Sequence, residues 1–457
     1  MLIDWQPWDS GTFARAARER KPVLLSIAAT WCEACHEMDR TTYADPEVAA
    51  IVRERFVPVR VDADRRPDIN DRYNLGGWPT TVFLTPDGGV ITGGTFVAAP
   101  TMPGVLTRVA AEFGRLAADG AERLAAECTD DAETSSNAAS DNTDDGLIES
   151  IFSSFDERHG GFGIEPKFPH TAPLHLALAL FRETGDPRWQ AIVLRTMDAM
   201  ADGPLWDARD GGFFRYATAR DWQLPHREKL LETNAAILRV CAEAAIVFGR
   251  DVDRDRCASI AQFITTTLRA DSGGYVGSEG DTVLYADGNA LASAALLAAA
   301  TVLGDDGLGR EALASFERVL LSCYRPGLGL AHYYDGAAHV RGLLADHVAA
   351  IGTLLDAHDA SGSEPYRMMA EELSHVIIRD LWDVERGGFF DRAPAPDDVG
   401  LLRLRRKPLN NAEAAIALDR AGFREHALGA LRVAARQIEG QGPAAALYAL
   451  ARRQLIN

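Results

Sequence analysis

Two cysteines separated by two residues, Cys32 and Cys35, carry the clearest chemistry in this chain. They follow an apolar run and open a stretch that is typical of a helix, so Cys32 falls at the helix start. Unpaired backbone N–H groups and the positive end of the helix dipole favour a negative sulfur there, the form that attacks disulfides. The spacing predicts thiol–disulfide exchange, with Cys32 as the accessible attacking thiol and Cys35 as the shielded, resolving thiol.

The neighbours of the two cysteines would tune this reactivity. Trp31 precedes the pair, and the carboxylate of Glu33 disfavours the thiolate and makes the pair more reducing, whereas a protonated His36 acts in the opposite direction. Half of a zinc site is an alternative, but no second Cys-x-x-Cys or spaced histidine pair completes it, so neither a metal nor a cofactor is expected. The remaining cysteines are expected to be buried or inert thiols: Cys128, Cys241, Cys257 and Cys323.

The elements around the pair follow from apolar runs and turn signals. Strands are expected at 22–29, 56–61, 81–84 and up to about 95, and helices from the cysteines, at 46–55 and at about 101–124. The resulting order, β-α-β-α-β-β-α, is that of a thioredoxin unit. In that fold, the position of Pro79 before its strand is where a cis-proline faces the cysteines, although an ordinary trans loop proline is the alternative.

Length and charge restrict the class of protein. At 457 residues the chain exceeds one ordinary core, so two domains are expected. The net charge of −19 argues against nucleic acid or an anionic membrane as a partner. An acid-rich and lysine-poor composition suggests a halophile, meaning a salt-adapted source, or a GC-rich one. No secretory signal is visible, and the longest apolar run, 290–303, is short and dotted with serine, so a cytoplasmic location is expected.

A segment poor in apolar residues marks the boundary between the two domains. Residues 127–146 are mostly Asp, Ser, Thr, Asn and Ala and cannot bury enough surface to offset chain entropy. We therefore expect a thioredoxin-like domain at 1–126, a disordered acidic linker at 127–146 and a second domain at 147–457.

A repeat organises the second domain. Glycine pairs with an aromatic or apolar residue recur at near-regular intervals: 160–162, 211–213, 273–275, 327–329 and 387–389. Each is followed by a polar cluster that starts an apolar helix, and then by a more amphipathic helix such as 187–200 or 365–381. Five such repeats, with 443–455 as a sixth inner helix and 147–155 to pair with it, predict an all-α (α/α)6 toroid.

Motifs along nearly the whole chain resemble one family. They are Trp5 to Trp8, Cys32 to His36, 66–69, 77–79, 83–88, 166–169 and 222–229. In this order they are similar to the thioredoxin-domain proteins of the spermatogenesis-associated protein 20 type. The resemblance implies a thioredoxin-like domain followed by an (α/α)6 barrel similar to those of N-acylglucosamine 2-epimerases and six-hairpin glycosidases. The family usually has a histidine where this chain has Glu33.

Polar residues at the expected inner-helix starts are candidates for a ligand site in the barrel. With Pro225 as a first helical residue, His226, Glu228 and Lys229 would fall within one turn. Lys167 and Lys229, from different repeats, are expected to point into one cavity. The other candidates are Arg215, Asn234, Asp287, Asp346 and His347. The competing interpretation is that residues such as Asp287, Asp346 and Asn289 only cap helices, and that the aromatic residues after the glycines only fill the core.

Three functions remain open. The first is a cytoplasmic thiol–disulfide oxidoreductase that acts on a protein or small-molecule disulfide, with a barrel that binds a sugar-like or peptide ligand. The second is a carbohydrate-active enzyme, either a sugar epimerase with two bases or a hydrolase with two carboxylates, with an accessory thioredoxin domain. The third is a binding scaffold without activity.

Overall fold

The computed structural model describes residues 2–119, 144–395, 397–402 and 404–456. The chain divides into two compact units: the first is Met1–Ala139 with Pro394–Leu404, and the second is Ser140–Ala393 with Arg405–Asn457. Most of the predicted linker, including Cys128, lies outside the described residues, and its last residues begin helix α7 (Asp144–Phe152). An uninterrupted second domain was expected, so the assignment of 394–404 to the first unit is a finding of the structure.

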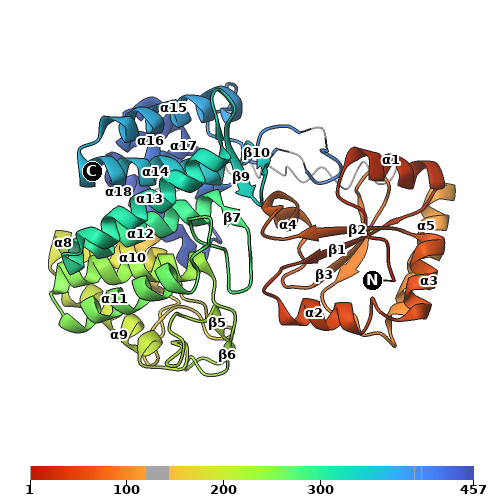
Figure 1. Cartoon of the computed structure of the whole chain (residues 1–457), viewed down its shortest axis with the longest axis horizontal. Coiled ribbons are helices and arrows are strands. Elements are labelled where there is room, and N and C mark those ends of the chain that lie inside the picture. Colours follow the sequence, from red (N-terminus) through yellow and green to blue (C-terminus); the bar gives the residue numbers. More distant parts are fainter. Residues whose placement is uncertain (1, 120–143, 396, 403, 457) are drawn as a thin grey trace. The chain divides into compact units, whose positions relative to one another are not determined.

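The first unit is a four-stranded sheet covered by helices on both faces (Figure 1). The strand order is β2-β1-β3-β4, with β1 parallel to β2 and antiparallel to β3. The strands are β1 (Val23–Ala28), β2 (Val57–Asp62), β3 (Thr80–Leu84) and β4 (Val90–Gly94). The helices are α1 (Ser10–Glu19), α2 (Glu33–Arg40), α3 (Pro46–Arg55), α4 (Pro67–Tyr73) and α5 (Met102–Asp119). The predicted thioredoxin-like fold is confirmed, whereas α1 and α4 were not predicted.

The central strands are apolar along their whole length because both faces are covered. Along β1, Leu25 and Ile27 join the core that includes the two cysteines and Tyr73 of α4. Leu24 points to the opposite face and joins a core built with residues of α3 and α5. This arrangement places the end of β1 and the start of α2, which carries the cysteines, against a fully packed sheet.

Residues 394–404, which we call the strap, complete the first of these two cores. Leu402 is 2% exposed and belongs to the same buried cluster as the cysteines. The Tyr73 hydroxyl accepts a hydrogen bond from the Leu401 N–H at 2.8 Å and donates one to the Gly88 carbonyl at 2.9 Å. A Cβ on Gly400, whose φ is +58°, would collide with the Gly88 carbonyl and the Tyr73 hydroxyl, so this close approach requires glycine.

Charged and polar groups fasten the strap at a second point. Asp397 forms an ion pair with Arg66 at 2.8 Å, and its carbonyl accepts a hydrogen bond from the Trp8 indole at 3.2 Å. Both ends of the strap return to one place in the second unit, where the Asp391 N–H donates to the Arg405 carbonyl at 2.7 Å and the Asp391 carboxylate accepts from the Arg405 N–H at 3.1 Å. The chain therefore leaves the second unit after Asp391 and re-enters it at Arg405, where the two ends are hydrogen-bonded to each other.

The second unit is a ring of helix pairs, as predicted. The inner helices are α8 (Ala172–Thr184), α10 (Leu231–Phe248), α12 (Ala286–Leu303), α14 (Leu344–Ser361), α16 (Pro408–Arg420) and α18 (Ala446–Ile456). Each packs against the next, and α18 packs against α8, which closes the ring. The outer partners, in the same order, are α9 (Pro187–Ala201), α11 (Asp251–Thr266), α13 (Asp306–Cys323), α15 (Glu364–Leu381), α17 (Arg424–Arg436) and α7. The (α/α)6 toroid is confirmed (Figure 1).

Short strands decorate the ring. They are β5 (Tyr216–Ala217), β6 (Pro225–His226), β7 (Leu284–Tyr285), β8 (Tyr324–Arg325), β9 (Gly329–Tyr334) and β10 (Ala338–Arg341), and a 3-10 turn, η1 (Gly442–Ala445), precedes α18. The interpretation of Pro225 as a first helical residue is wrong. Pro225 and His226 pair with β5, and α10 begins at Leu231, so His226 does not lie on the helix that carries Asn234.

Among the described helices, α12 is the one long and apolar enough to cross a membrane. Within the structure 67% of it is buried, because it is an inner helix that contacts both neighbours in the ring and its outer partner α13. Its uniform apolarity is what such a position requires.

The role of the strap can be tested by replacing Leu402 with Ala. Removing a fully buried leucine side chain costs about 2–5 kcal/mol, and the loss should appear in the first unit although Leu402 lies between barrel helices α15 and α16 in sequence. Hydrogen exchange measured by mass spectrometry should speed up in β1 and β3. The exposed Leu328, replaced by Ala, serves as the control and should leave these strands unchanged. Faster exchange confined to the inner helices would contradict the assignment.

Candidate functional site

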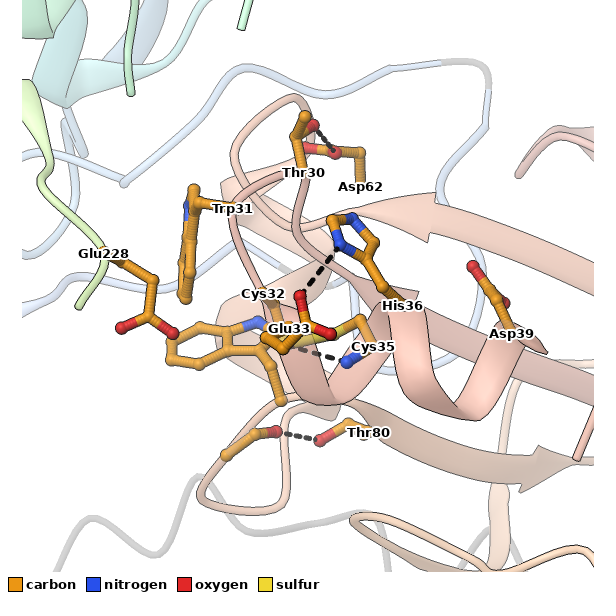
Figure 2. Close-up of a disulfide and its surroundings, with 12 residues drawn as sticks. Thr30, Trp31, Cys32, Glu33, Cys35, His36, Asp39, Asp62, Thr80 and Glu228 are labelled. Carbon is orange, nitrogen blue, oxygen red and sulfur yellow. Dashed lines mark hydrogen bonds and ion pairs between the residues drawn. A yellow bond between two sulfur atoms is a disulfide. The ribbon is translucent and has the colours of Figure 1, made fainter. Parts of the chain in front are cut away.

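The predicted redox pair is closed in a disulfide at the start of α2 (Figure 2). The Cα atoms of Cys32 and Cys35 are 5.2 Å apart. Cys32 is the residue that caps α2, and its sulfur accepts a hydrogen bond from the Cys35 N–H at 3.2 Å. A helix N-terminus and a directed N–H group both favour negative charge on this sulfur. The two cysteines are thus inequivalent in their electrostatic surroundings.

Accessibility does not distinguish the two sulfurs as expected. Cys32 is 4% exposed and Cys35 is 3% exposed, so the disulfide as a whole is buried. The prediction that Cys32 is the accessible thiol therefore does not describe the oxidised form. The physical reason is that Trp31 and Trp78 pack against the core that contains both cysteines.

Two tryptophans, Trp31 and Trp78, pack against the core that contains the disulfide. The rings of Trp31 and Trp78 meet edge to face, with centroids 5.5 Å apart. The indole of Trp31 donates to Asp64 at 2.7 Å, and that of Trp78 donates to Asn70 at 3.1 Å. The peptide bond between Trp78 and Pro79 is cis, as predicted. Sequence reasoning missed Asp64 and Asn70, because they lie after β2 and in α4, a helix that was not predicted.

The charges beside the cysteines are largely paired with each other. Arg40, about two turns along α2 from Glu33, hydrogen-bonds to its carboxylate at 2.7 Å. His36 lies 3.9 Å from the same carboxylate (Figure 2). The Arg40 guanidinium holds the pKa of Glu33 below its usual range. All three side chains are exposed, so their energetic effect is small. Glu33 was expected to disfavour the Cys32 thiolate, and Arg40 offsets its charge.

The structure does not bring Lys167 and Lys229 together in one cavity, which corrects the prediction. Lys167 is completely buried and donates to Asp156 at 2.8 Å, where Arg220 also binds. Lys229 is 6% exposed and pairs with Asp207 at 3.0 Å. It also pairs with Glu279 at 2.8 Å. A buried ammonium needs such partners, and these two lysines find theirs in separate loops.

The aspartates that receive these cations belong to the glycine repeat. Asp156, Asp207 and Asp383 each stand four residues before a glycine pair, and each accepts hydrogen bonds from the two backbone N–H groups that begin the turn. Their second oxygens pair with Lys167, Lys229 and Arg406, respectively. The regular spacing of these aspartates before the glycine pairs is visible in the sequence, but they were not predicted as functional residues.

Asn234 and His347, both predicted as ligand-binding, instead hold backbone groups of the glycine-aromatic loops. Asn234 accepts from the Phe213 N–H at 2.7 Å and donates to the Phe213 carbonyl at 3.1 Å. Asn289 and Asn411 do the same for Tyr275 and Phe389. In the fourth repeat His347 accepts from the Leu330 N–H at 3.0 Å and burial lowers its pKa, so the neutral ring fits this role.

The aromatic residues of the loops fill the core. Phe162, Phe213, Tyr275 and Phe389 are at most 1% exposed. Gly212, with φ at +83°, shows why the loops need glycine, because a Cβ there would lie 2.8 Å from the ring of Phe263. The core-filling interpretation of these aromatic residues is confirmed.

Arg215, His226 and Glu228 lie around Tyr216 on the β5–β6 ribbon. The His226 ring stacks on Tyr216 with centroids 4.3 Å apart, and the ring of Phe168 stacks on Tyr216 at 4.6 Å. Arg215 lies over the same tyrosine at 5.3 Å. Glu228 lies 3.7 Å from His226. We call the three stacked rings of Phe168, Tyr216 and His226 the aromatic stack. The stack is partly exposed, and its side chains take no part in the ion pairs of the two lysines.

Asp287 and Asp346 do not cap their helices, so the capping interpretation is wrong for them. The N-cap residues of α12 and α14 are Tyr285 and Leu343, which make no side-chain cap bonds. Instead, His332 of β9 lies between the two carboxylates, 2.8 Å from Asp346 and 3.9 Å from Asp287. Sequence reasoning missed His332, because it stands in a short strand that no periodicity signals.

A further carboxylate of the same region, Glu413 of α16, was also missed. Burial raises the pKa of Glu413 to about 7, with a contribution from the charge of Asp287. Burial likewise raises the pKa of Asp287. Asp287 of α12 and Glu413 of α16 thus lie in a region where burial opposes the ionisation of both carboxylates.

The structural role of the first ion pair can be tested by replacing Asp156 with Asn. The variant leaves the ammonium of Lys167 buried without a counter-charge, which costs about 3–5 kcal/mol. Urea unfolding followed by circular dichroism should show this loss. Asp221, an exposed neighbour in the same loop region, replaced by Asn, should change the free energy of unfolding by no more than about 0.5 kcal/mol. Equal stability of both variants would leave Lys167 free for a ligand.

The raised pKa of Glu413 predicts a pH-dependent stability. A folded-state pKa near 7, against 4.5 for an unperturbed glutamate, means that the folded chain binds more protons between these values and loses stability as the pH rises through them. Glu413→Gln removes this cost, so the variant should exceed the wild type by roughly 2–3 kcal/mol at pH 8 and match it below pH 4.5.

The measurement is urea unfolding at a series of pH values in metal-free buffer. The exposed Glu425 of α17, replaced by Gln, is the matched control and should follow the wild type at every pH. A constant difference between Glu413→Gln and wild type across the range would contradict the assignment.

The fold and the cysteine site together define a class: a thioredoxin-like domain with a Cys-x-x-Cys disulfide, joined to an (α/α)6 barrel. Comparisons with known proteins agree with both parts. Residues 2–128 match the family described as "Protein of unknown function, DUF255". A sugar epimerase from a ruminal bacterium covers 67% of this chain and 96% of its own, with a TM-score of 0.57 and 13% identity. Cellobiose 2-epimerase from Bacillus thermoamylovorans has a TM-score of 0.56 at 12% identity, covering 68% of this chain and 98% of its own.

Relatives that are similar in sequence align with up to about three fifths of this chain. Spermatogenesis-associated protein 20 of Mus musculus is 31% identical over 61% of this chain and 38% of its own length. An uncharacterized protein of Caenorhabditis elegans is 29% identical over 62% of this chain and 42% of its own. The chain thus aligns with about two fifths of the length of these relatives. Thiol:disulfide interchange protein DsbD of Cronobacter sakazakii is 31% identical over 21% of this chain and 17% of its own. The resemblance to the spermatogenesis-associated protein 20 type is confirmed.

Proposed function

We propose that Cys32 and Cys35 carry out thiol–disulfide exchange with a protein or small-molecule disulfide. The observation that carries this proposal is the position of Cys32 as the N-cap of α2, where its sulfur accepts a hydrogen bond from the Cys35 N–H. In the reduced pair, the Cys32 thiolate attacks one sulfur of the substrate and releases the other as a thiolate. Cys35, after losing its proton, then attacks the Cys32 sulfur of the mixed disulfide, which breaks its bond to the substrate and releases the second substrate sulfur as a thiolate, so the pair is oxidised and the substrate gains two electrons. An external thiol reductant restores the dithiol.

Several features support this chemistry. Trp31 and Trp78 pack against the core that contains the disulfide, and a cis peptide bond precedes Pro79. DsbD, whose name describes disulfide interchange, is similar over 21% of this chain. Arg40 hydrogen-bonds to Glu33 and so offsets the one carboxylate that stands next to Cys32 in the chain. The other described cysteines, Cys241, Cys257 and Cys323, are buried free thiols, which suits the reducing cytoplasm that we propose as the location.

The second part of the proposal concerns the barrel, to which we assign a sugar-like or peptide ligand. The aromatic stack of Phe168, Tyr216 and His226 offers flat apolar faces beside Arg215 and Glu228, which is the combination that polyhydroxylated ligands use. A sugar epimerase or glycoside hydrolase activity is the alternative, and a non-catalytic scaffold is the third. Turnover within a panel of amino sugars and disaccharides separates the second from the other two.

The redox proposal is tested with Cys35→Ser. Without the resolving thiol, attack by Cys32 on a disulfide substrate should stop at a stable mixed disulfide, detected by mass spectrometry under non-reducing conditions. Cys32→Ser is the matched control and should form no such adduct. Mapping of the adduct to Cys241, Cys257 or Cys323 would refute the assignment of Cys32.

A further inference from the structure

We propose that Asp287, His332 and Asp346 bind one divalent transition-metal ion in the barrel. One donor atom from each of the three lies within 4.8 Å of the other two. Ligands held about 2.0–2.2 Å from one zinc ion lie about 3–4 Å from each other, so small side-chain rotations bring these donors to binding distance. The site is independent of the disulfide chemistry proposed for the first unit.

An unused donor at the centre of the cluster is the strongest indication of a ligand. Asp346 is completely buried, and its Oδ2 accepts no hydrogen bond from any of the described residues, while Oδ1 faces His332 at 2.8 Å. A buried carboxylate oxygen without a partner is costly, because it has lost its hydration and gained nothing. A cation bound to Oδ2 would supply the missing interaction.

Helix capping does not explain these side chains. Neither carboxylate caps its helix, and the sequence position of His332 in the middle of β9 is not that of a turn or cap residue. Two carboxylates converge on His332, one completely buried and one partly buried. A divalent cation can neutralise two carboxylates that meet at one point.

The donor set indicates the class of ion. Two carboxylates and one imidazole suit Zn²⁺ or Mn²⁺, whereas Ca²⁺ and Mg²⁺ prefer oxygen alone. Three protein ligands leave at least one coordination position for water or for a ligand oxygen. Asp287 is the member of the cluster that reaches solvent, with 20% of its side chain exposed, so the open position is expected on its side.

The test uses the full chain with Cys32 and Cys35 both replaced by Ser, because reduced thiols also bind zinc. Equilibrium dialysis followed by elemental analysis should show one Zn²⁺ per chain. Co²⁺ should give a visible absorption band of a site with mixed nitrogen and oxygen ligands. Asp346→Asn or His332→Gln should weaken binding by at least about 100-fold, because loss of even an outer partner of a metal ligand costs about 10–100-fold.

Two further variants keep the test decisive. Asp287→Asn alters the partly exposed ligand and so spares the buried core, and it should weaken binding in the same way if Asp346→Asn fails to fold. His339→Gln, on the neighbouring strand β10, removes an exposed histidine paired with Asp335 and should leave binding unchanged. Absence of stoichiometric metal, or binding that survives all three ligand variants, would overturn the proposal.

Discussion

The barrel depends on one repeated contact, in which a side chain near the start of an inner helix forms hydrogen bonds with the backbone of the preceding glycine loop. Asn234, Asn289 and Asn411 do this with both an oxygen and a nitrogen, and His347 does it with a ring nitrogen. A buried peptide group must be paired, and one amide satisfies its donor and its acceptor together. These hydrogen bonds hold the loop that follows an outer helix against the start of the next inner helix. The helices are thereby positioned so that the ring can close.

The same repeat explains why the fold could be predicted and much of the site could not. Periodicity indicates where helices lie, and the predicted ring of helix pairs was confirmed, although the predicted helix start at Pro225 was wrong. It does not report partners: Lys167 is satisfied by Asp156, and Asn234 by the backbone of Phe213. A polar residue at a pocket rim and one that locks a loop have the same sequence signature. The missed groups, His332 and Glu413, stand where no pattern marks them.

The cysteine site was more predictable because its chemistry is local. Two cysteines at a helix start define their own geometry within one turn, and the cis bond before Pro79 agrees with the fold. What the sequence could not supply came from elsewhere in the chain. Asp64 orients the indole of Trp31, and Arg40 compensates Glu33 from the far end of α2.

The strap has a consequence for how this protein is made. During translation, the part of the first unit from α1 to α5 leaves the ribosome well before residues 394–404 are synthesised. The delay is on the order of tens of seconds at about 5–20 residues per second. Until then Tyr73 lacks its bond to Leu401, and the core that contains the cysteines lacks Leu402. The N-terminal domain, although synthesised first, therefore completes its core only after most of the barrel has been translated.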